Sequence, residues 1–103
     1  MIAAAPSPPA RVQIVAREFS LAPSRRTLKA GTAIVELANF GEDPHNLRLQ
    51  RVGGTKVYGL PVQQSGEVAD LTVRLLPGTY RLWCSLADHR ALGMRATLVV
   101  SRR

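Results

Sequence analysis

The chain has 103 residues, enough for one domain with a single core but not for two. Hydrophobic residues make up 46% and charged residues 20%, a globular composition that excludes a disordered chain. No apolar run is long enough to span a membrane. The 14 basic and 7 acidic side chains give a net charge of +7, which favours an acidic protein face or an anionic membrane surface as partner. Nucleic acid is not expected, because the basic residues are scattered and aromatic residues are few.

The first ten residues, MIAAAPSPPA, are small and proline-rich and show no amphipathic period. We expect Met1–Ala10 to form a flexible tether, followed by a single domain over residues 11–103. The tether has no positively charged stretch followed by an apolar one, so it does not have the pattern of a signal peptide. One hypothesis is that it remains from a signal or membrane anchor that has been removed.

Alternating apolar residues predict short strands through the first half of the chain. The first strand begins near Val12, with Ile14 and Ala16 on the same inward face. The elements expected after it are, in order, a bend at Phe19–Pro23, a short strand at Arg26–Lys29, a strand at Thr32–Asn39, a loop at Gly41–Pro44 and a new alternation from His45.

Glycine and proline interrupt the segment Arg51–Gly66 repeatedly, which predicts mainly loop with a short strand at Lys56–Tyr58. Regular alternation returns at Ala69–Leu75, and Pro77-Gly78 predicts a hairpin turn into a strand at Thr79–Cys84. A last strand is expected at Arg95–Ser101. About seven or eight short strands without a convincing helix predict an all-β Greek-key β-sandwich.

The segment Tyr80–Met94, YRLWCSLADHRALGM, holds the only cysteine, one of two histidines and the only methionine besides Met1. The spacing is C-x4-H-x4-M, formed by Cys84, His89 and Met94, and the other histidine is His45. One thiolate, two imidazoles and one thioether are the ligands of a type 1 (blue) copper site, with Met as the weak axial ligand. The sequence therefore predicts that these four residues bind one copper ion.

Each of these residue types also has a more ordinary role. Taken singly, a cysteine is usually a small buried hydrophobe, a histidine a partly exposed polar residue and a methionine core filler. Zinc is the competing metal, but a structural zinc site normally recruits two or more cysteines. A catalytic zinc site needs an open ligand position and a nearby base, for which Asp88 is the candidate.

Nearly the whole of Val12–Val100 resembles the cupredoxins, the family of small blue-copper proteins. The residues that carry the resemblance, besides the ligands, are the Phe19…Pro23 bend, Ala30-Gly31-Thr32, Asn39, Pro44-His45-Asn46, Pro77-Gly78-Thr79-Tyr80 and Cys84-Ser85. The ligand loop is most similar to that of auracyanin and rusticyanin. A departure from the family pattern is Asp88, where Gly or Pro often precedes the second histidine.

The resemblance implies that His45, Cys84, His89 and Met94 are the copper ligands, with both imidazoles binding through Nδ1. It also implies that Asn46 hydrogen-bonds to Ser85 and so ties the two ligand loops together. A local backbone bond is the ordinary alternative for an Asn or Ser in a loop.

In function, the resemblance implies a monomeric, extracytoplasmic carrier of single electrons between redox partner proteins, and not an enzyme. Periplasmic copper delivery or storage without electron transfer is the alternative, although exposed Met and His clusters are lacking. A third class of function is a domain of a larger oxidase, but the sequence has no further histidines to supply a second copper site.

Electrons are expected to leave at the edge of His89, within an apolar ring of Pro44, Leu86, Ala91 and Leu92. The arginines near the ligand segments predict a basic copper end: Arg48, Arg51, Arg90 and Arg95. Trp83 is bonded to Cys84 yet should face the opposite side of its strand, so it is a candidate second port for electrons.

Overall fold

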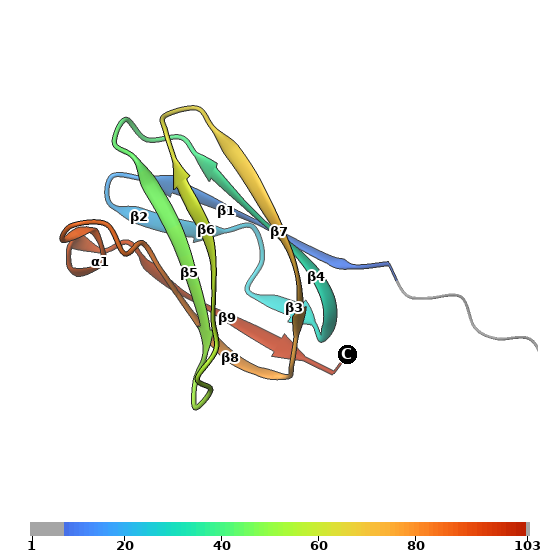
Figure 1. Ribbon diagram of the computed structural model, residues 1–103. Helices are drawn as coiled ribbons and strands as arrows, with labels where there is room; N and C mark the ends of the chain where they lie inside the picture. Colours follow the sequence, from blue (N-terminus) through green and yellow to red (C-terminus); the bar gives the residue numbers. More distant parts are fainter. Residues whose placement is uncertain (1–7, 103) are drawn as a thin grey trace, which may run out of the picture.

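The computed structural model describes residues 8–102, which form two sheets packed face to face (Figure 1). The strands are β1 (Ala10–Arg17), β2 (Ser20–Pro23), β3 (Thr27–Lys29), β4 (Gly31–Asn39), β5 (His45–Arg51), β6 (Val57–Gln63), β7 (Val68–Leu75), β8 (Gly78–Trp83) and β9 (Arg95–Ser101). One sheet has the order β2-β1-β4-β7 and the other β3-β9-β8-β5-β6. The predicted all-β sandwich is confirmed, with nine strands in the described residues rather than seven or eight.

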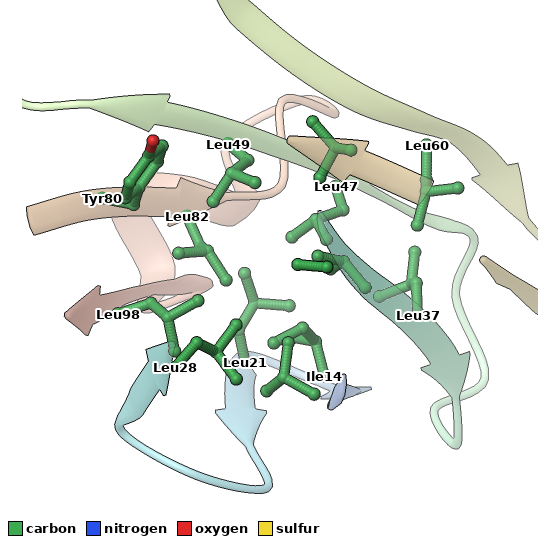
Figure 2. Close-up of a cluster of buried hydrophobic side chains, with 14 of the residues drawn as sticks. Ile14, Leu21, Leu28, Leu37, Leu47, Leu49, Leu60, Tyr80, Leu82 and Leu98 are labelled. Carbon is green, nitrogen blue, oxygen red and sulfur yellow. The ribbon is translucent and has the colours of Figure 1, made fainter. Parts of the chain in front are cut away.

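The core lies between the sheets, and strands such as β1, β4 and β8 alternate buried residues with more exposed ones (Figure 2). Ile14 and Leu37 come from the four-stranded sheet, while Leu49, Leu82 and Leu98 come from the five-stranded sheet. Each of these five side chains is at most 1% exposed. The inward faces predicted for the first strand and for Tyr80–Cys84 are therefore confirmed.

Strand pairing brings three chain segments to one end of the sandwich. β5 runs antiparallel to β8 with Arg48 opposite Trp83, and β8 runs antiparallel to β9 with Trp83 opposite Arg95. The beginning of β5, the end of β8 and the beginning of β9 therefore meet at the same end. The short helix α1 (His89–Leu92), which was not expected, lies at this end and connects β8 to β9 (Figure 1).

Two segments without a clear pattern are strands in the structure. The expected bend at Phe19–Pro23 contains β2, which pairs antiparallel with β1. The short strand expected at Lys56–Tyr58 is the longer β6, which continues through Pro61. Proline is tolerated there because β6 is an edge strand, where the missing N–H is not needed by a neighbour.

Pro77-Gly78 does not form a hairpin turn, which corrects the prediction for this segment. β7 belongs to the four-stranded sheet and β8 to the five-stranded sheet, so the chain crosses from one sheet to the other. The Tyr80 hydroxyl fixes this crossing, because it accepts a hydrogen bond from the Leu76 N–H (2.9 Å) and donates one to the Leu76 carbonyl (3.1 Å).

Tyr80→Phe is expected to weaken the fold without touching the ligands. It removes both bonds to Leu76, and a lost hydrogen bond typically costs about 1 kcal/mol of unfolding free energy. Urea unfolding measures the change. Tyr58→Phe is the control, since no hydrogen bond of its hydroxyl is found in the described residues, and it should have little effect.

The predicted tether lies largely outside the described residues, which begin at Pro8. Ala10 already belongs to β1 and pairs with Ala33. The single domain over residues 11–103 stays a prediction. Within residues 8–102, no helix combines the length and apolar character that crossing a membrane requires.

Candidate metal centre

Three of the four predicted ligands gather at the end of the sandwich that carries α1. His45 begins β5, Cys84 directly follows β8 and His89 begins α1. One ligand atom from each residue lies within 4.8 Å of the others. His45 and Cys84 are fully buried and His89 is 9% exposed. A thiol and two imidazoles in one buried pocket form a donor set that can hold a metal ion.

The imidazole nitrogens are oriented consistently with metal binding. His89 Nδ1 lies 3.6 Å from Cys84 Sγ. His45 Nδ1 is buried and has no hydrogen-bond partner within the described part of the chain. A buried polar atom without a partner costs folding free energy, and binding of a metal ion to this nitrogen would remove that cost. The donor set therefore fits the group that the sequence predicts.

Backbone hydrogen bonds close the ligand loop onto Met94, the fourth predicted ligand. The Cys84 N–H donates to the Met94 carbonyl (3.1 Å), and the Met94 N–H donates to the His89 carbonyl (3.0 Å). Met94 is fully buried and directly precedes β9. The two bonds fix the backbone of the methionine beside that of the cysteine and of the second histidine.

Gly93 permits this tight closure. Its φ of 128° is a backbone conformation that residues other than glycine rarely adopt. A Cβ there would also come within 2.8 Å of the Phe19 carbonyl oxygen. The loop therefore approaches the β1–β2 turn more closely than any other residue type would allow.

Asn46 and Ser85 join the two ligand loops by a pair of hydrogen bonds. Asn46 Nδ2 donates to Ser85 Oγ, and the Ser85 N–H donates to Asn46 Oδ1, each at 2.8 Å. Asn46 is 3% exposed, so water competes little for these bonds. Each residue follows a predicted ligand, so the pair links the chain at His45 directly to the chain at Cys84.

The turn between β1 and β2 supplies two site residues that the sequence did not indicate. The Glu18 carboxylate lies 3.3 Å from His45 Nε2, and the Phe19 ring centre lies 5.0 Å from that of His89. The Asp43 amide holds the pKa of Glu18 below its ordinary value, helped by the Glu42 amide and His45 against partial desolvation. The carboxylate is therefore ionised at neutral pH.

The other predicted site residues lie on the surface around α1. Pro44, Ala91 and Leu92 are exposed and Leu86 is half-buried. Asp88, the candidate zinc-site base, is exposed and does not belong to the buried donor cluster.

The five-stranded sheet is basic near the site, but Arg51 does not contribute to this end as predicted. It closes β5 at the opposite end, where its Nε donates to the Pro77 carbonyl (2.8 Å). None of the sheet's five strands contains Asp or Glu. Arg81, Arg90 and Arg95 are exposed and line a surface groove together with Thr79 and Thr97. The Arg90 guanidinium lies 4.5 Å from the centre of the half-buried Trp83 ring. Within residues 8–102, no carboxylate forms an ion pair with these arginines.

No protein-family model matches the sequence, and no curated protein matches it significantly. Solved structures are similar to it. Auracyanin from Roseiflexus castenholzii has a TM-score of 0.72 at 18% identity, over 88% of this chain and 96% of auracyanin. Auracyanin A, a blue copper protein from Chloroflexus aurantiacus, has a TM-score of 0.71 at 18% identity, over 91% and 100%.

A multicopper oxidase is also similar, with a TM-score of 0.64 at 19% identity, over 88% of this chain but only 41% of the oxidase. Identities this low show a shared fold rather than a shared activity. The predicted resemblance is confirmed at that level, since the described chain has the strands and sheets of these proteins and places a histidine–cysteine–histidine cluster at one end. The described chain therefore has the fold of these auracyanins, the cupredoxin fold.

Proposed function

We propose that His45, Cys84, His89 and Met94 bind one copper ion and that the protein carries single electrons between redox partners. The observation that supports this most is the buried cluster of Cys84 and two histidines, in which His45 Nδ1 has no partner in the described residues. When bound, copper supplies a one-electron Cu(II)/Cu(I) couple.

The chain's own contribution is a rigid and dry pocket. Three of the proposed ligand residues, His45, Cys84 and Met94, lie at or next to strand ends and are held by the Cys84–Met94 and Asn46–Ser85 hydrogen bonds. Ligands fixed in this way keep one geometry in both oxidation states, which keeps reorganisation small. Burial of His45, Cys84 and Met94 excludes water from the pocket.

His89 is the proposed exit for electrons, because it is more exposed than the other three ligand residues. Phe19 packs against its ring and is itself 36% exposed, and Leu92 is 52% exposed. Exposed apolar residues of this kind suit transient docking. Trp83 stays a candidate second port on the basic face.

The partner is proposed to present an acidic face. The groove lined by Arg81, Arg90 and Arg95 supports this, because three exposed cations that have no carboxylate partner among residues 8–102 attract an anionic surface. An anionic membrane surface is the alternative occupant. We further propose a monomer that works outside the cytoplasm, as the resemblance to cupredoxins implies.

Visible spectroscopy of the copper-loaded protein tests the function. An intense thiolate-to-Cu(II) band that bleaches and returns through reduction and oxidation supports the carrier. A colourless or readily exchanged copper site would instead favour copper delivery or storage. Turnover of a reducing substrate with O₂ by this chain alone would overturn the proposal that it is not an enzyme.

Charge reversal in the groove is expected to slow electron transfer with anionic reagents. At low salt, Arg81→Glu and Arg95→Glu should each reduce the rate with a small anionic oxidant severalfold, because they remove local attraction. The difference should fade above about 0.1 M salt, where the screening length is about 10 Å. Stopped-flow rates against ionic strength measure it.

Arg74→Glu is the matched control, since Arg74 is exposed on β7 of the opposite sheet and carries the same charge. Equal rate losses in all three variants would show that net charge matters and the groove does not. Equal rates with anionic and cationic reagents of matched driving force would leave only apolar docking at His89.

A further inference from the structure

We infer that Glu18 is a positioning residue for the metal centre: it fixes the ring of His45 with Nδ1 toward the metal and places a negative charge beside that ligand. The inference rests on the proposed function, because it assumes that His45 is a ligand. Glu18 lies 27 residues before His45 in the sequence, and the fold brings the two side chains together.

The contact is a hydrogen bond between a carboxylate and a buried imidazole ring. Glu18 Oε2 lies 3.3 Å from His45 Nε2, and the His45 side chain is 0% exposed while that of Glu18 is 26% exposed. Within residues 8–102 this is the only pairing of an acidic with a basic side chain at salt-bridge distance. No other carboxylate of the described chain lies within salt-bridge distance of a basic side chain.

The carboxylate is itself held in place by the loop that leads into His45. Glu18 Oε1 accepts hydrogen bonds from the Glu42 N–H and from the Asp43 N–H, the second at 2.6 Å. Its other oxygen is left for His45. One carboxylate therefore joins the end of β1, the β4–β5 loop and the first residue of β5.

Gly41 makes room for this arrangement. A Cβ at residue 41 would lie 1.8 Å from Glu18 Oε2, the oxygen that faces His45. The obstructed atom is the end of a flexible side chain, so Gly41→Ala would move the carboxylate at little cost to the fold. This variant displaces Glu18 without changing its charge.

The carboxylate acceptor determines the tautomer of His45, that is, which ring nitrogen carries the hydrogen. An ionised carboxylate can only accept, so the hydrogen of a neutral His45 ring belongs on Nε2. The lone pair is then on Nδ1, the buried atom that has no partner in the described chain. A ligating histidine is commonly oriented by a carboxylate in this way, which also makes the imidazole a stronger donor.

A fixed negative charge stabilises the more positive oxidation state of the metal. Glu18→Gln keeps the length of the side chain but removes the charge. It also replaces one of the two acceptor oxygens by an NH2 group, so either the loop amides or His45 loses its acceptor. We expect the Cu(II) affinity to fall about tenfold more than the Cu(I) affinity, within the usual range for second partners of metal ligands. For a one-electron couple that difference raises the reduction potential by about 59 mV.

The matched control for charge is Glu42→Gln, which removes an exposed carboxylate from the same loop and keeps the Glu42 N–H that Glu18 uses. Voltammetry of the copper-loaded proteins should show a clear rise for Glu18→Gln and little change for Glu42→Gln. Equal shifts in the two variants would overturn the inference, because they would report only general charge.

A second readout does not depend on copper or on electron transfer. In the zinc-loaded protein, ¹⁵N NMR of the wild type should show His45 with hydrogen on Nε2, and that hydrogen should exchange slowly with water. Glu18→Ala and Gly41→Ala should both speed its exchange at least tenfold. If Glu18→Ala fails to fold, Gly41→Ala still tests the role of Glu18, because it displaces the carboxylate without removing it.

The outcomes separate this inference from the proposed function. If zinc binds through His45 Nδ1 with a protected Nε2–H but copper gives no reversible couple, the electron-carrier proposal fails and the role of Glu18 stands. If the wild-type hydrogen resides on Nδ1, or exchange is the same in all variants, the role of Glu18 is wrong even though the copper site is blue.

Discussion

Copper-loaded Cys84→Ala protein is expected to lack the visible band of the wild type completely. The band requires a thiolate bonded to Cu(II), and Cys84 is the only cysteine in the sequence. Because Cys84 is fully buried at the end of the core, the small alanine should be accepted without disrupting the strands. An absorption spectrum with copper quantified in the same sample measures the change.

Met94→Leu is the matched comparison, because it removes the ligand that is expected to bind copper most weakly. A thioether on the axis forms a weak bond, so this variant should keep copper and colour, and its reduction potential should rise. Leucine also preserves the apolar volume of a buried residue. A wild-type spectrum in Cys84→Ala, or a colourless Met94→Leu, would contradict the assigned roles of the two residues.

The sequence points to a candidate ligand set because the chemistry of these residues, rather than their position, makes them stand out. A chain with one cysteine and two histidines has few ways to build a soft metal site. The structure brings one ligand atom each of His45, Cys84 and His89 within 4.8 Å of the others. With the C-x4-H-x4-M spacing the loop closes on itself, because the Cys84 N–H donates to the Met94 carbonyl.

Strand pairing was predicted less well, because alternation identifies a buried face but not the neighbouring strand. Residues 69–75 and 79–84 both alternate around Pro77-Gly78, which is also what a hairpin shows. The chain instead crosses between sheets at that point, fixed by the Tyr80 hydroxyl at Leu76. β6 was predicted too short for a related reason, since its glycine and proline are tolerated only at an edge.

Glu18 could not have been found from its local sequence. An acidic residue after a strand normally indicates a solvated turn. Its contact with His45 depends on the parallel pairing of β1 with β4, which brings the end of β1 beside Asn39 and the loop that follows. Such residues become visible only when the register of distant strands is known.

Asn46→Ala is expected to weaken copper binding about 10- to 100-fold, the usual cost of losing a partner that orients metal ligands. The substitution removes both bonds to Ser85, so the chain at His45 is no longer tied to the chain at Cys84. It also leaves the Ser85 N–H without the Asn46 oxygen, which costs about 1–3 kcal/mol if water cannot replace it.

Ser85→Ala provides the graded control. It removes the bond from Asn46 Nδ2 to Ser85 Oγ but keeps the bond from the Ser85 N–H to Asn46 Oδ1. The loss of copper affinity should therefore be smaller than in Asn46→Ala. Competition with a chelator of known affinity measures both variants, and thermal unfolding without metal separates loosening of the site from loss of fold. An Asn46→Ala protein with unchanged affinity, spectrum and melting temperature would show that the two loops hold their positions without this link.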